Sequence, residues 1–259
     1  MKINPTKHLW RTWIPNGLSI GNLVFGFFSI VISSHSLKSP GHELNLFLLA
    51  ALFIIIAAFF DGMDGPLARA LNAQSPLGSH LDSLADLTTF GLAPGALMYF
   101  MYLSDIKYPI SGWKYPLPIG LIIASLFPIC AAYRLARFNV AHDSRSFTGL
   151  PSPVAGLSVA FLPFLTKYAG PLPLKFTLSL FIIMAILMVS NIRYSKPQAK
   201  FLAHLNWLRL FFFAVVVVLL MLWLGWYWVI LGVTILYIFS GLVSLFLNML
   251  QKIPFWKRH

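Results

Sequence analysis

The sequence has few acidic residues and few charges of any kind. Only 7 of its 259 residues are Asp or Glu, and charged residues make up 10% of the chain, whereas hydrophobic residues make up 58%. A soluble domain carries about a quarter charged residues. We therefore expect an all-α protein, a polytopic transmembrane helical bundle that forms one domain over residues 1–259.

Cysteine is almost absent as well. Cys130 is the only one, and it lies in an apolar run, so the chain can form no intrachain disulfide. The ligands of a cysteine–histidine zinc site are also missing. The net charge of +12 comes from basic residues in short loops between apolar runs. That pattern indicates membrane topology and attraction to anionic lipids, and it argues against a nucleic-acid partner.

Long apolar runs are what the sequence has in quantity. About 20 residues cross the hydrocarbon core of a bilayer as a helix. We predict six core spans followed by an accessory helix pair over 208–248, with the fifth span broken by Pro163. The eight spans lie near 17–34, 45–61, 83–103, 117–138, 152–168, 172–191, 208–224 and 227–248.

The basic residues predict the orientation of these spans. An even number of spans puts both termini on one side of the membrane, and the loops on that side carry 14 Lys and Arg residues against 5 on the other. Since cytoplasmic loops are enriched in Lys and Arg, both termini are expected to face the cytoplasm.

Four of the seven acidic residues lie in one stretch, residues 61–86. They form one pair three residues apart and one pair four residues apart, and either spacing puts both carboxylates on one face of a helix. The four are Asp61, Asp64, Asp82 and Asp86. A carboxylate at a membrane boundary is costly to keep, so the cluster indicates a functional site facing the cytoplasm.

The type of ligand suggests what this site binds. Four close carboxylates repel one another unless they are protonated or bind divalent cations. Oxygen ligands without Cys or His select Mg²⁺, Mn²⁺ or Ca²⁺, and two carboxylate pairs on neighbouring helices suit two ions and phosphate chemistry. Arg69 offers a fixed cation for a phosphate oxygen. Pro66 is expected to kink or restart the helix just after the first pair. In the alternative interpretation, the carboxylates are structural and pair with Arg69, Arg134 and Arg137.

The same stretch carries a family resemblance. The pattern Asp61-x2-Asp64-Gly65-x2-Ala68-Arg69-x8-Gly78-x3-Asp82-x3-Asp86 resembles the signature of the CDP-alcohol phosphotransferases at every fixed position. These integral membrane enzymes displace CMP from a CDP-linked alcohol with a second alcohol. The resemblance implies that the four aspartates hold two Mg²⁺ or Mn²⁺ ions and that Asp86 is the base that deprotonates the acceptor hydroxyl. It also implies that the CDP group contacts Asn16, Ser19, Gly65, Ala68, Arg69, Ser75 and Gly78.

Four further stretches resemble the serine-accepting branch of this family. They are IPNGLSIGN at 14–22, LDSLAD with FGLAP within 81–94, RLARFN at 134–139 and FTGLPSP at 147–153. With the signature they cover about residues 14–156. The resemblance implies CDP-diacylglycerol and L-serine as substrates, a homodimer in a bacterial inner membrane, and a site for the serine carboxylate or a lipid phosphate at Arg134, Arg137 or Asn139.

Several alternatives stay open at this point. Asn16 and Ser19 could cap the first helix, and Arg134 and Arg137 could simply end a span on the basic side. The acceptor could be glycerol 3-phosphate, inositol or choline. From a different class, the chain could be a divalent-cation transporter with intramembrane carboxylates. Against that, the acids cluster at the cytoplasmic end of the spans and not near the midplane, where transporter sites lie.

Overall fold

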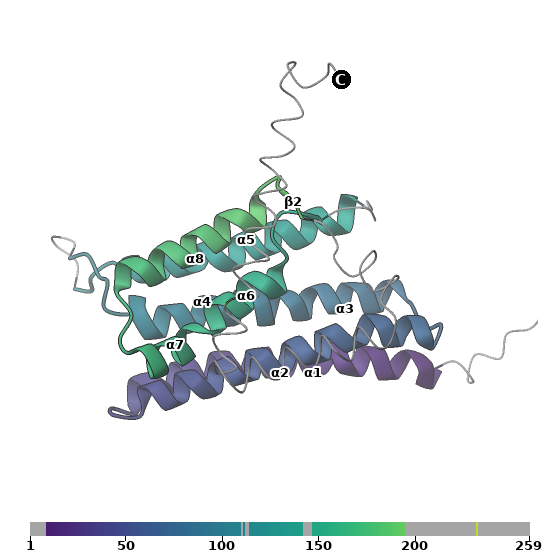
Figure 1. Cartoon of the computed structure of the whole chain (residues 1–259), viewed down its shortest axis with the longest axis horizontal. Coiled ribbons are helices and arrows are strands. Elements are labelled where there is room, and N and C mark those ends of the chain that lie inside the picture. The colour runs from purple at the N-terminus through teal and green to yellow at the C-terminus, as the bar shows by residue number, and fades with distance from the viewer. Residues whose placement is uncertain (1–8, 110, 112–113, 142–146, 195–231, 233–259) are drawn as a thin grey trace, which may run out of the picture.

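The computed structural model describes residues 9–109, 111, 114–141, 147–194 and 232. The described chain is helical apart from a two-residue antiparallel ladder, in which β1 (Phe147–Thr148) pairs with β2 (Arg193–Tyr194). Its helices run roughly alongside one another, with α1 and α2 on one side of the bundle and α5 and α8 on the other (Figure 1). The predicted all-helical fold is confirmed.

The first two spans form a helical hairpin. A short 3₁₀ turn, η2 (Ser36–Lys38), follows α1 (Leu9–His35) and precedes α2 (Glu43–Ala70). Because α1 begins at Leu9, Asn16 and Ser19 lie within the helix, so the interpretation of these residues as helix caps is wrong. A kink or a restart was expected at Pro66, and the restart is wrong, since α2 continues to Ala70. Pro66 is exposed near the end of α2.

The third predicted span is a continuous but irregular helix from Pro76 to Leu103. It consists of α3 (Pro76–Leu87), the π-helical turn η3 (Thr88–Leu92), α4 (Ala93–Met98) and a second π-helical turn, η4 (Tyr99–Leu103). π-Helical turns often occur at functional sites. Here η3 packs against α1 and directly follows the α3 turn that carries Asp86.

The remaining described helices complete the bundle. They are α5 (Ile119–Ala141), α6 (Ser152–Ala160), α7 (Leu162–Ala169) and α8 (Leu174–Val189). The predicted break in the fifth span lies at Phe161, two residues before Pro163. Pro163 is in the first turn of α7, where no intrahelical N–H is required, and a proline there cannot extend the preceding helix.

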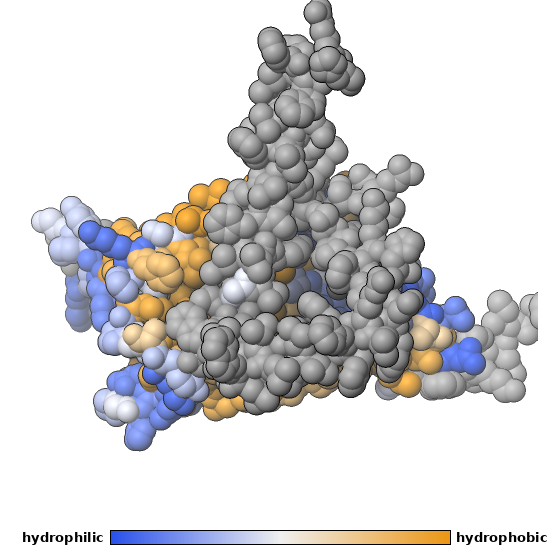
Figure 2. All heavy atoms as spheres, viewed as in Figure 1, coloured by the Kyte–Doolittle hydropathy of each residue, from blue (hydrophilic) through white to orange (hydrophobic). Residues whose placement is uncertain are grey.

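Three of these helices are long and apolar enough to cross a membrane: Arg11–Lys38, Glu43–Ala70 and Ile119–Val140. Hydrophilic residues gather at both ends of the visible described surface, and apolar residues lie between them (Figure 2). The third predicted span is one continuous helix with two π-helical turns, and the fifth is divided at Phe161. Apart from residue 232, the accessory pair at 208–248 lies outside the described residues, so the count of eight spans stays a prediction.

Small residues let the helices approach closely around η3. A Cβ added at Gly26 of α1 would lie 2.9 Å from the Cα of Thr89. A Cβ added at Gly156 of α6 would lie 2.9 Å from the Cα of Phe90. Backbone contacts of this kind determine how closely α1 and α6 pack against the helix from Pro76 to Leu103. They therefore also determine how close the residues of α1 come to the aspartates.

We predict that Gly26→Ala lowers the stability of the fold. The added methyl group must displace backbone atoms of η3, and overpacking of this kind costs about 1–3 kcal/mol. Thermal unfolding in detergent measures the effect. Gly17→Ala on the same helix is the matched control, because a Cβ there meets nothing within 4 Å. A Gly26→Ala protein as stable as Gly17→Ala would contradict the predicted packing.

Candidate functional site

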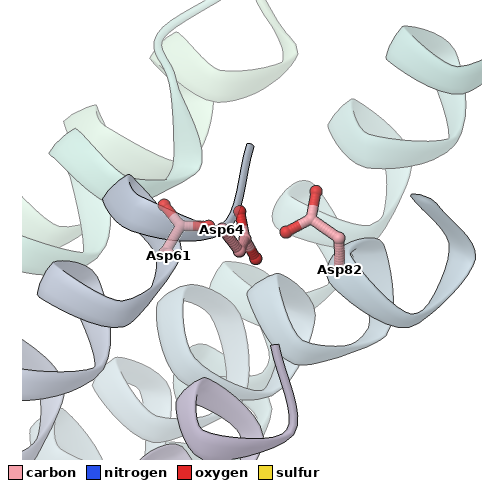
Figure 3. Close-up of side chains that lie close together, drawn as sticks. All are labelled: Asp61, Asp64 and Asp82. Carbon is pink, nitrogen blue, oxygen red and sulfur yellow. The ribbon is translucent and has the colours of Figure 1, made fainter. Parts of the chain in front are cut away.

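The two aspartate pairs meet where α2 ends and α3 begins. Residues 71–75 join these helices, and Asn72 turns the chain with a positive φ of 50°, a conformation that Asn tolerates better than most residues. Both helices pack against α1, and their acidic side chains approach one another. Ligand oxygens of Asp61, Asp64 and Asp82 all lie within 4.8 Å of one another and point into a common space (Figure 3).

Asp86 lies one turn after Asp82 on α3 and belongs to the same cluster. Its carboxyl interacts with those of Asp61 and Asp82. Among the described residues, Oδ1 of Asp82 and Oδ1 of Asp86 are buried without a hydrogen-bond partner. Buried carboxylate oxygens are costly unless something binds them, so these atoms are available as ligands.

Within the part of the chain that the structure describes, positive charge compensates only part of the cluster. The charge of Arg134 acts on both Asp61 and Asp86, and its side chain is 7% exposed. One arginine cannot neutralise four carboxylates, which argues against a purely structural role for all four. The oxygen-only donor set fits a divalent cation such as Mg²⁺ or Mn²⁺. The acidic cluster can thus bind a metal.

Ser19 ties α1 to the cluster. Its hydroxyl donates a hydrogen bond of 2.8 Å to Oδ2 of Asp64, and both residues are buried. The bond orients the Asp64 carboxylate, which is the usual contribution of an outer partner of a metal ligand. Sequence reasoning assigned Ser19 to the nucleotide and missed this contact, which depends on how deeply α1 packs.

A cavity of about 310 Å³ opens onto the aspartates. Asp64 and Asp82 are part of its wall. So are all seven residues that the resemblance assigns to CDP: Asn16, Ser19, Gly65, Ala68, Arg69, Ser75 and Gly78. Residues far apart in the sequence are therefore brought around one space next to the acidic cluster.

Sequence reasoning missed four residues in the wall of this cavity. They are Pro15, Ala73, Gln74 and Ser79. Ala73, Gln74 and Ser79 lie at variable positions within the signature and Pro15 precedes Asn16, which was the available signal. None has a side chain that by itself points to nucleotide chemistry.

The first turn of α3 closes one side of the cavity. Ser75 is the N-cap, and its Oγ accepts a hydrogen bond of 3.0 Å from the Gly78 amide. A Cβ at Gly78 would lie 2.9 Å from Oδ1 of Asn16, so glycine lets α1 and α3 approach. Gly65 is less constrained, since a Cβ there would meet Arg69 Nη1 at 3.6 Å.

The three residues considered for serine or a lipid phosphate have different surroundings. Arg134 donates a bond of 2.6 Å to the hydroxyl of Ser152, at the first residue of α6. Asn139 donates to Ser83 Oγ at 3.0 Å, next to Asp82 in sequence. The charge of Arg134 acts on Asp61 and Asp86.

Arg137 is held by the end of α8 instead. Its guanidinium donates to the carbonyl oxygens of Val189 and Ser190, each at 3.1 Å, and to Asn191 Oδ1 at 3.2 Å. These carbonyls follow the last helical turn and have no partner within the helix, so Arg137 fastens α8 to α5.

Comparison with known proteins gives a consistent result. Residues 12–237 match the family model for CDP-alcohol phosphatidyltransferase, which extends beyond the motif region 14–156. A Bacillus subtilis protein named CDP-diacylglycerol–serine O-phosphatidyltransferase is 39% identical over 153 residues, which are 59% of this chain and 76% of that protein. A Helicobacter pylori protein of the same name is 34% identical over 201 residues, covering 75% of this chain and 74% of the relative.

A third relative has a different name. A Methanothermobacter thermautotrophicus protein named archaetidylserine synthase is 31% identical over 186 residues, covering 71% of this chain and 70% of that protein. The names of all three relatives refer to serine.

We predict that Ser19→Ala weakens metal binding by about 10–100-fold, the usual effect of losing an outer partner of a metal ligand. Mn²⁺ titration of the purified protein, followed by electron paramagnetic resonance, measures this directly. Ser34→Ala is the control, because the hydroxyl of Ser34 bonds only to the carbonyl of Val31 on its own helix. Equal Mn²⁺ affinities in the two variants would show that the Ser19 bond does not support the site.

Proposed function

We propose that this chain, which belongs to the CDP-alcohol phosphatidyltransferase family, transfers the phosphatidyl group of CDP-diacylglycerol to the hydroxyl of L-serine, giving phosphatidylserine and CMP. The observation that carries this proposal is the cavity in which the seven expected nucleotide residues adjoin the acidic cluster. The serine acceptor is supported by the names of the relatives.

The cavity suits the CDP group. Arg69 lines it and provides a planar cation for a pyrophosphate oxygen. Gly78 keeps that wall free of a side chain, and Ser75 and Asn16 present polar atoms beside it. The diacylglycerol chains would extend from this end of the bundle into the bilayer.

Asp61, Asp64, Asp82 and Asp86 would hold two divalent ions, Mg²⁺ or Mn²⁺. When bound, such ions neutralise the pyrophosphate and stabilise the charge on departing CMP. The residues fit this role because their oxygens are close together, partly buried and incompletely paired.

Asp86 would be the general base. An alcohol is a weak nucleophile until a base within hydrogen-bonding reach accepts its proton. Asp86 takes the proton of the serine hydroxyl, and the serine oxygen forms a bond to the phosphorus that carries diacylglycerol. The bond from that phosphorus to the bridging oxygen breaks, and CMP leaves with the electron pair.

Arg134 is the residue we assign to the serine carboxylate. It is buried, it contacts the start of α6 through Ser152, and its charge acts on Asp86. A carboxylate bound there would place serine beside the proposed base. Arg137 and Asn139 were alternatives, but their hydrogen bonds to Val189 and Ser83 connect helices to one another, so we give them a supporting role.

The orientation follows from the basic loops. We propose that the site faces the cytoplasm of a bacterial inner membrane, where CDP-linked lipid and serine meet. The implied homodimer stays a prediction. The transporter alternative has little support, since the matched family transfers phosphatidyl groups and the four aspartates gather at one end of α2 and α3.

The direct test of this function is CMP release by the purified protein with CDP-diacylglycerol and Mn²⁺ or Mg²⁺. We expect release to depend on added serine and the lipid product to be phosphatidylserine. Glycerol 3-phosphate, inositol and choline are tested in parallel. Release that responds to one of these and not to serine would contradict the proposed acceptor but not the proposed chemistry.

We predict that Asp86→Asn lowers kcat by about 10²–10⁴-fold, the contribution expected of a positioned general base. Binding of CDP-diacylglycerol should stay measurable. Asp105→Asn is the control, because Asp105 is exposed in the loop after η4. Turnover of Asp86→Asn at the rate of the unmodified protein would remove Asp86 as the base.

We predict that Arg134 and Arg137 differ in what their replacement changes. Arg134→Lys keeps a charge but loses the planar fork, so KM for serine should rise about tenfold or more while KM for CDP-diacylglycerol changes little. Arg137→Ala should instead lower the thermal unfolding temperature, because the carbonyls at the end of α8 lose their donor. The opposite pattern would exchange the two assignments.

A further inference from the structure

The buried face of α1 carries polar side chains at intervals of three, four and seven residues. Ser19, Asn22, Ser29 and Ser33 are each at most 3% exposed. Ser19 bonds to Asp64, whereas the side chains of the other three have no hydrogen-bond partner within the part of the chain that the structure describes. Asn22 stands out because both its donor, Nδ2, and its acceptor, Oδ1, are unpaired.

Two contacts place this part of α1 near the segments that carry Asp61 and Asp86. A Cβ at the preceding residue, Gly21, would lie 2.9 Å from the ring of Phe60, which directly precedes Asp61. The carbonyl oxygen of Asn22 accepts a bond of 2.9 Å from Thr89 Oγ1, and Thr89 is three residues after Asp86.

The register along α1 agrees with this placement. Asn22 is three residues after Ser19, so the two side chains share a face about one turn apart. Asp61 precedes Asp64 by the same interval on α2, which runs antiparallel to α1. Asn22 thus lies at the level of Asp61 and Asp86, as Ser19 lies at the level of Asp64.

Two unpaired groups of opposite kind therefore lie on α1 and α3, which pack against each other. Nδ2 of Asn22 is a buried donor without an acceptor, and Oδ1 of Asp86 is a buried acceptor without a donor. A buried polar group without a partner is costly, and such groups persist where function requires them. An apolar side chain of the same size would fill this space at a lower cost.

We propose that Asn22 is a positioning residue for Asp86. In the working site its Nδ2 donates to Oδ1 of Asp86, which keeps a second lone pair for a cation, while the other carboxylate oxygen accepts the proton of the acceptor alcohol. Because Asn22 is fully buried, it acts through Asp86 and does not touch substrate. The inference rests on the proposed function, since it takes Asp86 as the base.

The test compares Asn22→Leu with the unmodified full-length protein in detergent. Leu has nearly the same shape but removes both unpaired groups, so the thermal unfolding temperature should stay the same or rise. The kcat for CMP release should fall by about tenfold or more, the usual cost of losing an outer partner, with KM for CDP-diacylglycerol nearly unchanged. Asn22→Ser, which keeps a donor, should recover part of kcat.

Ser29→Ala and Ser33→Ala are the matched controls. Each removes a buried, unpaired hydroxyl from the same face of α1, two or more turns from Asn22. Their kcat should equal that of the unmodified protein. A fall in kcat as large as that of Asn22→Leu would mean that any change on this face disturbs turnover, and it would overturn the proposal.

Two further outcomes would overturn it. Asn22→Leu could keep the kcat of the unmodified protein, or it could lose thermal stability in proportion to activity, which is the behaviour of a structural residue. The assay uses whichever alcohol supports CMP release in the unmodified protein. If serine does not support release but another alcohol does, serine is rejected as the acceptor and the role of Asn22 is still tested. If no alcohol supports release, the proposed function is rejected, and a lower unfolding temperature of Asn22→Leu would separately contradict the proposed role of Asn22.

Discussion

Repulsion among four carboxylates in an otherwise apolar chain is the constraint on which the rest of the structure depends. Oxygens of Asp61, Asp64 and Asp82 lie within 4.8 Å of one another, and Asp86 adjoins them. A short connection between α2 and α3 forces this proximity. Arg134 and the Ser19 hydroxyl supply some compensation, but the cluster keeps buried oxygens without partners. Hard oxygen ligands of this kind select divalent cations, so the cluster can bind a metal.

The cavity and the aspartate cluster adjoin each other and share Asp64 and Asp82. The turn at the start of α3 caps the helix through Ser75, lets α1 approach at Gly78 and leads directly to Asp82. A phosphate group held beside that turn would therefore lie next to the carboxylates. The π-helical turn after Asp86 packs against α1 and α6, so the position of the proposed base depends on how closely these helices pack.

Sequence reasoning grouped aspartates that the structure brings together, but it located the helix ends less well. Residue spacing determines which side chains share a helix face, so the aspartate pairs could be found from the sequence. The residues that line the cavity were named by the family resemblance and not by spacing. Helix ends and contacts between helices depend on tertiary packing. For that reason the start of α1 at Leu9, the unbroken passage through Pro66, the Ser19–Asp64 bond and the attachment of Arg137 to α8 were missed.

The central claim is that the four aspartates bind two divalent ions beside a nucleotide cavity. The most direct measurement is anomalous scattering from crystals of the full chain grown with Mn²⁺ and CDP-diacylglycerol. We predict two Mn²⁺ peaks between α2 and α3, coordinated by Asp61, Asp64, Asp82 and Asp86. Saturating Mn²⁺ that leaves these carboxylates without an ion, or that binds only elsewhere on the chain, would contradict it.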